Sequence, residues 1–248
     1  LKILIFKFIH FIMSISSKLT YLSFLKQSGI SVFLKNDPTN HYKKLSTKKE
    51  IFDIKLSEIE SLEHLKQYIE QSDNCSLKKN AKNTVFSDGN PESKIMLIGE
   101  APGAEEDKQG KPFVGLAGKL LDKMLTSINL DRNSVYITNV IPWRPPNNRT
   151  PDSEEILECL PFIQKHIEII KPKIIVLLGS TAAKAILSST NGIMKIRGQW
   201  FEYNNLNLIE PIKTIAIFHP AFLLRSPLHK KETWKDLQEI QKKYHEEK

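Results

Sequence analysis

Polar side chains that can move protons or read a planar ligand follow short apolar runs of this sequence. Glu100 comes directly after the run 95–99, Asn139 lies at the end of a β-rich run, and His219 follows another such run. Glu106 belongs to a cluster of acids a few residues after Glu100. Carboxylates and imidazoles serve as general acids and bases, and an amide distinguishes hydrogen-bond donors from acceptors. These residue types predict acid–base chemistry on a ligand that is recognised by its hydrogen-bonding groups.

The elements that must position these residues are strands alternating with helices. Four runs read as strands, at 95–98, 135–140, 174–178 and 214–218, and helical patterns follow at about 115–128, 152–170, 180–188 and 230–244. Continuous apolar runs suit strands that are buried on both faces. We therefore expect an α/β fold with three layers, α/β/α, around a central, mainly parallel four-stranded sheet. In such a sheet ligands bind at the carboxyl ends of the strands, where the polar residues above lie.

An aromatic residue and several arginines fall in the same connecting segments. Phe113 stands in a turn after the first strand, and Arg144, Arg149 and Arg225 occupy turn-forming segments of a chain that otherwise favours lysine. Arginine offers a rigid charged fork that suits phosphate. Each feature alone also fits a structural role: a solvated helix start for the acids, and the core for His219 and Phe113. Their joint placement at one sheet edge favours a site.

Composition sets wider limits on the class of protein. The 248 residues carry a formal net charge of +8, which suits an acidic partner such as nucleic acid but equally reflects a lysine-rich composition. Two cysteines, Cys75 and Cys159, do not make a disulfide-stapled scaffold. No apolar run reaches the roughly 18 residues that cross a bilayer. We expect a cytoplasmic protein that has no membrane partner.

The first part of the chain has a weaker pattern. We interpret residues 1–13, which end at Met13, as an over-extension of the gene model. A membrane-surface anchor is the alternative. Residues 14–74 form an N-terminal extension with a helix over 56–71, for which Ser57 and Glu60 offer a capping box. Residues 75–248 form the second expected domain, which contains the predicted strands. The segment 74–93, at the junction with the extension, reads as loop.

From residue 75 onward the sequence resembles the uracil-DNA glycosylase superfamily, most closely its type-4 enzymes. Five segments carry the resemblance: GEAPGAEEDKQGKPFVGLAGKLLDKML (99–125), VYITNVIPWRPPNNRTP (135–151), IIVLLGSTAAKAIL (174–187), KIRGQW (195–200) and FHPAFLLRSP (218–227). The resemblance implies a DNA-repair enzyme of base-excision repair that swings a uracil nucleotide out of DNA and hydrolyses its N-glycosidic bond, which leaves an abasic site.

The resemblance also implies roles for the site residues. Phe113 would stack on the base, and Asn139 would distinguish uracil from cytosine, because its amide can accept from N3–H and donate to O4. His219 would stabilise the leaving uracil by donating to O2, and backbone amides of the 99–103 turn, around Ala101, would add to that field.

A carboxylate and a DNA-binding edge complete the implied site. Ala101 stands where the broader superfamily often has a catalytic aspartate, so Glu100 is the candidate for activating water or stabilising the sugar, with Glu106 as its partner. The resemblance implies a wedge and a phosphate contact at Leu223, Leu224 and Arg225. Further DNA-binding candidates are Arg144 and Arg149.

One departure concerns a cofactor. Type-4 enzymes usually hold a [4Fe–4S] cluster through four cysteines, of which Cys75 and Cys159 match the first and the fourth. Lys78 and Trp143 occupy the second and third positions, and neither side chain is an iron ligand. We therefore expect no cluster and no other cofactor.

Two other functions remain open alternatives. One is a non-catalytic protein that binds uracil or damaged DNA and kept the fold after losing its cluster. Another is a related glycosylase that stays covalently attached to the abasic site, although the segment 147–151 lacks the basic, histidine-containing insertion associated with that behaviour. The expected partners are uracil-containing DNA, single- or double-stranded, and downstream enzymes of base-excision repair.

Overall fold

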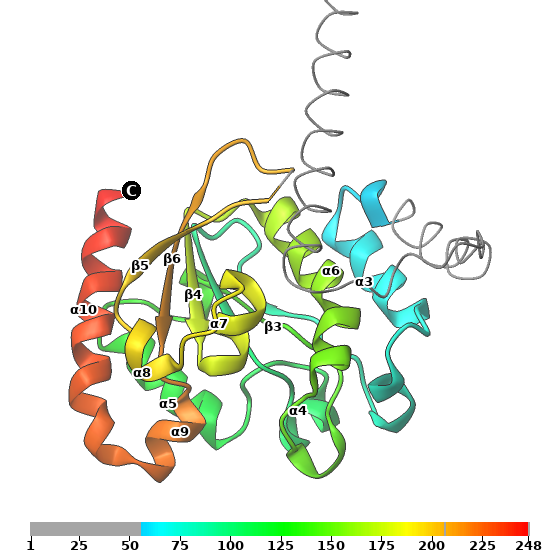
Figure 1. Cartoon of the computed structure of the whole chain (residues 1–248), viewed down its shortest axis with the longest axis horizontal. Coiled ribbons are helices and arrows are strands. Elements are labelled where there is room, and N and C mark those ends of the chain that lie inside the picture. Colours follow the sequence, from blue (N-terminus) through cyan, green and yellow to red (C-terminus); the bar gives the residue numbers. More distant parts are fainter. Residues whose placement is uncertain (1–55, 206, 248) are drawn as a thin grey trace, which may run out of the picture. The chain divides into compact units, whose positions relative to one another are not determined.

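Four apolar runs form the parallel centre of a six-stranded sheet (Figure 1). The structure is a computed structural model that describes residues 56–205 and 207–247. Its strands are β1 (Asp88–Gly89), β2 (Ile95–Gly99), β3 (Tyr136–Asn139), β4 (Ile174–Leu178), β5 (Trp200–Tyr203) and β6 (Ile212–Ile217). They lie in the order β1-β3-β2-β4-β6-β5, and β3, β2, β4 and β6 run parallel.

The α/β class and the four parallel strands are confirmed, but the expected total of four strands is wrong. The two additional strands, β1 and β5, pair antiparallel at the two edges of the sheet. β1 has only two residues, and β5 is mostly half-buried or exposed. Neither has the continuous apolar run that marks a strand buried on both faces, which is why the sequence pattern did not reveal them.

Helices and single turns connect the strands. The α-helices are α3 (Leu62–Gln71), α4 (Ala104–Gln109), α5 (Leu116–Thr126), α6 (Ser153–Ile170), α7 (Ser180–Leu187), α8 (Ile193–Ile196), α9 (Pro220–Arg225) and α10 (Lys230–Glu246). Short 3₁₀ turns are η1 (Ser76–Asn80), η2 (Arg132–Ser134), η3 (Pro146–Asn148) and η4 (Pro227–His229). The expected helices correspond to α5, α6, α7 and α10, whereas η1 and β1 lie within the segment 74–93 that was expected to be loop.

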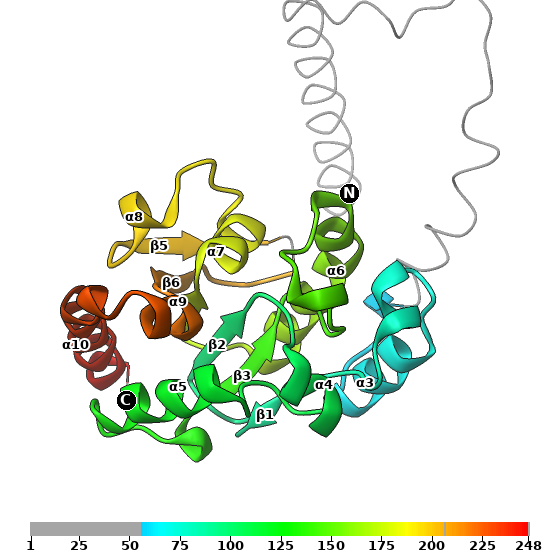
Figure 2. The same ribbon diagram turned by 90° about the horizontal axis from the view of Figure 1, so that it is seen from below.

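The helices cover both faces of the sheet and give the expected three layers. On one face, side chains of α5 and α10 pack with alternate residues of the strands in one apolar cluster, for example Leu121 and Leu237 against Leu97 and Val176. On the other face, α7 contacts β2 and β4, and α6 contacts β3 through the buried pair of His166 and Tyr136. Figure 2 shows α5, α9 and α10 on one side of the strands and α6 and α7 on the other.

Helix α3 packs against α6 rather than standing apart from the sheet domain. Leu65 and Ile69 are fully buried, and the ring of Tyr68 meets that of Phe162 edge-on at 6.4 Å between centroids. The helix begins after Ser61, whose hydroxyl accepts from the backbone of His64, so the expected capping box at Ser57 is wrong. The described residues belong to one compact unit. Our interpretation of residues 1–13, and most of that of 14–74, lies outside the described residues.

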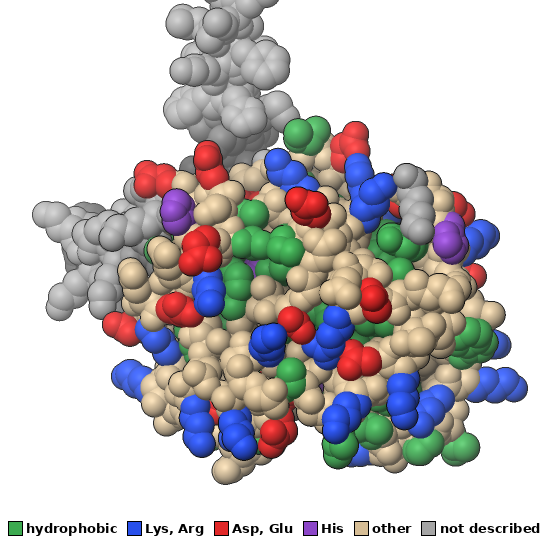
Figure 3. Space-filling view, turned by 180° about the vertical axis from the view of Figure 1, so that it is seen from behind, with side chains coloured by type: hydrophobic (Ala, Val, Ile, Leu, Met, Phe, Trp, Pro, Cys, Tyr) green, Lys and Arg blue, Asp and Glu red, His purple; other side chains and the backbone are tan. Residues whose placement is uncertain are grey.

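The surface carries charges of both signs. On the face shown in Figure 3, Lys and Arg side chains are mixed with Asp and Glu over the middle and upper part, and Lys and Arg predominate along the lower edge. Within the described residues, none of the helices has the length and apolar character that a membrane span requires.

Candidate active site

A pocket of about 450 Å³ opens at the carboxyl ends of the parallel strands. Such ends are where open α/β sheets bind ligands. The side chains predicted from the sequence to form a site meet there, drawn from the segments after β2, β3 and β6. The lining residues are Glu100, Ala101, Pro102, Gly103, Glu106, Phe113, Ala117, Asn139, Pro145, Asn148, Arg149, Thr150, His219, Ala221, Phe222 and Arg225.

The floor of the pocket depends on the missing side chain of Gly99. This residue is paired with Asn139 across the parallel strands β2 and β3. A Cβ atom on Gly99 would stand 2.3 Å from Oδ1 of Asn139 and 2.6 Å from Cζ of Phe113, closer than any real contact. Glycine is therefore the residue that lets an amide and an aromatic ring approach the same point of the backbone.

Asn139 holds an unpartnered acceptor in this floor. Its side chain is 6% exposed, and Oδ1 is the one buried side-chain oxygen or nitrogen without a hydrogen-bond partner in the described part of the chain. Leaving a buried polar atom unpaired costs about 1–3 kcal/mol. Structures tolerate such an atom where a ligand supplies the partner, which makes Asn139 the strongest indication of a binding site.

Phe113 borders the pocket from a strained loop position. Its φ of +54° lies in the left-handed region, which a bulky residue rarely adopts, and its ring is buried. The ring lies 5.6 Å from that of His219, centroid to centroid, at an interplanar angle of 31°. Its backbone rests on Gly118 of α5, where a Cβ would stand 1.7 Å from the carbonyl oxygen of Phe113. The backbone of the loop therefore packs closely against α5 at Gly118.

His219 is neutral and its proton position is fixed by the start of α9. Nδ1 accepts a hydrogen bond from the backbone N–H of Ala221 at 3.1 Å, so the proton is on Nε2. Burial, reinforced by the charge of Arg225 and opposed by that of Glu106, lowers the pKa of His219 to about 4. A neutral imidazole with a free Nε2–H at the pocket wall is a hydrogen-bond donor for a ligand oxygen.

The two candidate glutamates differ in what already binds them. One oxygen of Glu100 accepts from the hydroxyl of Thr181, at the start of α7, and the residue lines the pocket. Oε1 of Glu106 accepts from the backbone N–H groups of Val114 and Gly115, at 2.9 and 2.8 Å. Glu106 therefore supports the loop of Phe113 through two hydrogen bonds, whereas Glu100 accepts one, from Thr181.

The predicted DNA-binding residues separate into two groups. Arg149 and Arg225 both line the pocket, and Arg149 is held by a bidentate pair with Glu155 at 2.5 and 2.8 Å. Arg144 does not line it and donates to Asn148 at 2.7 Å. Leu224 is 44% exposed, as a wedge requires.

Leu223 occupies a different place from the one expected for a wedge. It is 1% exposed and belongs to the apolar cluster on one face of the sheet, because adjacent side chains of helix α9 point about 100° apart. Leu224 is thus the residue of this pair that can reach a bound nucleic acid.

Sequence reasoning missed two residues that support the site from outside the pocket. Thr181 holds Glu100, and Arg132 of η2 donates to the carbonyl oxygens of Pro112 and Phe113. Both residues contact partners that are distant in the sequence. Each also lies in an element whose sequence shows no unusual residue pattern. The one signal for Arg132 was its type, since arginine is scarce in this lysine-rich chain.

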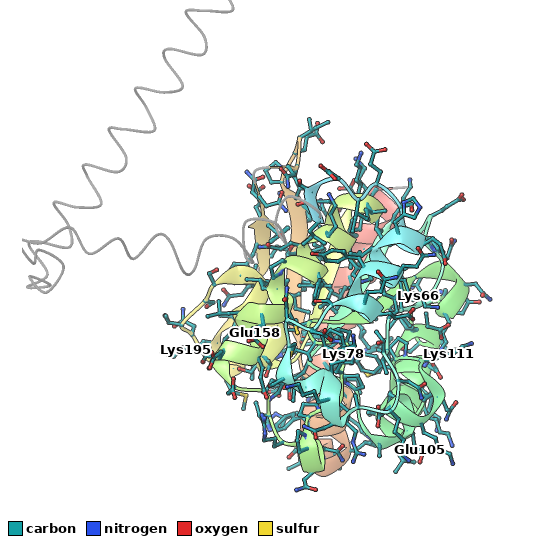
Figure 4. The ribbon with its side chains drawn as sticks, turned by 90° about the vertical axis from the view of Figure 1, so that its right-hand side faces the viewer. Lys66, Lys78, Glu105, Lys111, Glu158 and Lys195 are labelled. Atoms are coloured by element: carbon teal, nitrogen blue, oxygen red, sulfur yellow. The ribbon has the colours of Figure 1, made fainter. Side chains whose placement is uncertain are left out.

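The four positions that correspond to a cluster in type-4 enzymes do not fit one. Cys75 and Cys159 are buried and share a hydrogen bond that lowers the pKa of the Cys75 thiol and raises that of Cys159. Lys78, labelled in Figure 4, donates through Nζ to the carbonyl oxygens of Glu70 and Ser72, at 2.7 and 2.9 Å. Two thiols provide half of the ligands that such a cluster needs.

Trp143 fills the remaining corner as a core residue. It is 1% exposed, its Nε1 donates to Oγ1 of Thr84 at 3.0 Å, and its ring meets that of Phe162 edge-on at 6.0 Å. Phe162 in turn contacts Tyr68 of α3. Aromatic packing and the Lys78 hydrogen bonds thus join α3, η1 and α6, the segments that carry the two cysteines or flank them.

Comparison with known proteins identifies the family. The model of the Uracil DNA glycosylase superfamily matches residues 86–238, which include all of the pocket. The type-4 uracil-DNA glycosylase of Archaeoglobus fulgidus is 41% identical over 186 residues, 73% of this chain and 92% of that protein. The chain belongs to the uracil-DNA glycosylase superfamily.

Other relatives place it within that superfamily. The type-4 uracil-DNA glycosylase of Thermotoga maritima is 42% identical over 168 residues, 67% of this chain and 85% of that protein. A type-5 uracil-DNA glycosylase of Pyrobaculum aerophilum is 26% identical over 148 residues, 54% of this chain and 63% of that protein. The resemblance to type-4 uracil-DNA glycosylases inferred from the sequence motifs is confirmed.

The state of His219 can be measured directly. We expect the nitrogen shifts of this imidazole in an NMR titration to report a neutral ring with the proton on Nε2 down to about pH 4, because the buried ring disfavours the charged form. The unfolded chain takes up this proton near pH 6.5, so this residue favours unfolding increasingly as the pH falls from 6.5 towards 4. A His219→Asn variant assigns the signal. Protonation near pH 6.5, or a proton on Nδ1, would contradict the geometry.

Proposed function

We propose that this uracil-DNA glycosylase receives an extrahelical uracil in the pocket between Phe113, Asn139 and His219 and hydrolyses its N-glycosidic bond, leaving an abasic site. The observation that carries the proposal is the buried, unpartnered Oδ1 of Asn139. A base inside a duplex cannot reach this pocket, so its nucleotide must leave the stack. The volume of the pocket, about 450 Å³, exceeds the volume of one pyrimidine and leaves room for the attached sugar.

Asn139 supplies the specificity in this proposal. Its Oδ1 accepts from uracil N3–H and its Nδ2 donates to O4. Cytosine presents an acceptor at N3 and a donor at N4, so both contacts would oppose like groups. Each mispaired buried group costs roughly 1–3 kcal/mol. The base pairs with the amide while its face lies against the ring of Phe113.

His219 supplies stabilisation of the leaving group. When the bond between N1 and C1′ breaks, its electron pair stays on uracil, and negative charge reaches O2. The Nε2–H of a neutral imidazole can donate to that oxygen as the charge develops. A charged imidazolium is not required, which agrees with a pKa held near 4.

Glu100 serves the sugar side of the reaction. Its carboxylate, oriented by Thr181, stabilises the positive charge that develops on the sugar and accepts the proton of the water whose oxygen bonds to C1′. Glu106 holds the loop of Phe113 in place, because its Oε1 accepts hydrogen bonds from two backbone N–H groups of that loop. This assigns water activation to the glutamate with fewer existing hydrogen bonds.

The rims of the pocket would hold the DNA. Arg149 and Arg225 both line the pocket and suit phosphates that flank the extruded nucleotide, and Arg144 is a further candidate contact. Exposed Leu224 can fill the gap left in the stack. The abasic product passes to downstream enzymes of base-excision repair. We assign this activity to a monomer in the cytoplasm, at the nucleoid.

The reaction depends on His219, and its removal tests the proposal. We expect His219→Ala to lower the rate of uracil release from an oligonucleotide by about 100- to 1,000-fold, the usual effect of losing one donor to a developing oxyanion. The matched control is His64→Ala, on the exposed face of α3 away from the pocket, which we expect to leave the rate unchanged. Binding without base release by the unaltered protein would favour the non-catalytic alternative.

We also propose that the chain folds and works without an iron–sulfur cluster. Lys78 and Trp143 are engaged in packing and hydrogen bonds where two thiolates would be needed, and this supports the proposal. We expect protein purified without oxygen to contain no stoichiometric iron or sulfide and to retain full activity after growth in iron-depleted medium. About four irons per chain would contradict it.

Lys78 gives a second test of the same corner. Charged hydrogen bonds contribute about 1.5–3 kcal/mol each, so we expect Lys78→Met to lower the free energy of unfolding by an amount of that order. Lys79→Met changes an exposed neighbour and is the matched control. Equal stability of the two variants in denaturant unfolding would show that the Lys78 contacts do not replace a cluster.

A further inference from the structure

The loop between α4 and α5 that presents Phe113 is held by side chains from elsewhere rather than by secondary structure of its own. Oε1 of Glu106 accepts from the backbone N–H groups of Val114 and Gly115. On the other side of the loop, Arg132 donates through Nη1 to the carbonyl of Pro112 at 3.3 Å and through Nη2 to that of Phe113. One anion and one cation thus hold four consecutive residues.

Arg132 is itself fixed by two carboxylates. Its Nη1 lies 2.7 Å from Oδ2 of Asp88 on β1, and its Nε lies 2.8 Å from Oδ1 of Asp122 on α5. The guanidinium is planar and its donors have fixed directions. Because the two acids fix the directions of Nε and Nη1, the planar guanidinium also fixes the direction of Nη2, which donates to the carbonyl oxygen of Phe113.

The loop needs this support because its conformation is unfavourable by itself. Phe113 has a φ of +54°, and a bulky residue in the left-handed region costs of order 1–3 kcal/mol. Without Arg132, the carbonyl of Phe113 would lose its donor and the peptide could rotate towards an extended conformation. Such a rotation would move the ring away from Gly99 and from the floor of the pocket.

We propose that Arg132 is a positioning residue for base recognition, which acts by holding the ring of Phe113 in place for stacking. Arg132 does not line the pocket, so it affects the base only through that loop. The inference rests on the proposed function, in which Phe113 stacks on uracil. It also assigns the Asp88 and Asp122 pair the task of directing the guanidinium.

A double-mutant cycle between Arg132 and Phe113 tests this, with kcat/KM for uracil release as the readout. If Arg132 acts through the ring, Arg132→Met should lower kcat/KM by about 10- to 100-fold when Phe113 is present, since displacement of a positioning group by about 1 Å can cost that much. The same change should cost less than about threefold in a Phe113→Ala background. Coupling of this kind identifies residues that work as a unit.

Controls separate this inference from general stability and from the proposed function. Lys213→Met breaks a salt bridge to Glu202 away from the pocket and should not alter kcat/KM. Arg132→Lys keeps a charge between the two carboxylates but not the fork, and it completes the cycle if Arg132→Met does not fold. We expect a loss that again depends on Phe113. Equal fold losses in both backgrounds would overturn the inference, whereas absence of uracil release by the unaltered protein would overturn the proposed function instead.

Discussion

The approach of Asn139 and Phe113 to the bare backbone of Gly99 is the constraint on which the site depends. Parallel pairing of β2 and β3 places Gly99 opposite Asn139, and any Cβ there would collide with both the amide and the ring. The amide oxygen is consequently buried without a partner. The chain bears an unsatisfied acceptor and a strained Phe113 at the same place, a combination that is stable only because the surrounding sheet and loop hold it.

Sequence reasoning located the main site residues because their signals are local. The strands were visible as uninterrupted apolar runs, and parallel strands bring their carboxyl ends to one edge, so Glu100, Asn139 and His219 could be placed together. The roles of Thr181 and Arg132 could not be predicted, since each acts on a residue about 20 or more positions away. The edge strands β1 and β5 were not predicted because they lack a continuous apolar run. The burial of Leu223 was not predicted because it depends on the orientation of α9.

In the corner around Cys75 and Cys159, packing and hydrogen bonds engage the residues at the other two positions. Lys78 ties η1 to the end of α3 through two carbonyl oxygens, and Trp143 packs on Phe162 of α6. Neither contact reaches the pocket, whose lining residues come from other segments. We infer that the reaction of this uracil-DNA glycosylase depends on the residues at its strand ends and not on the corner around Cys75 and Cys159. Residues of that corner can therefore change without altering the pocket.

If the Asn139 amide distinguishes uracil from cytosine, its replacement by a carboxylate must change the base preference. The most direct measurement compares kcat/KM for uracil and cytosine release by the unaltered protein and by Asn139→Asp. A carboxylate cannot donate to uracil O4, so we expect the variant to lose at least about tenfold in uracil preference, the equivalent of one hydrogen bond of 1.4 kcal/mol. Asn90→Asp, at an exposed position, is the matched control. Unchanged preference for uracil over cytosine in Asn139→Asp would contradict the account.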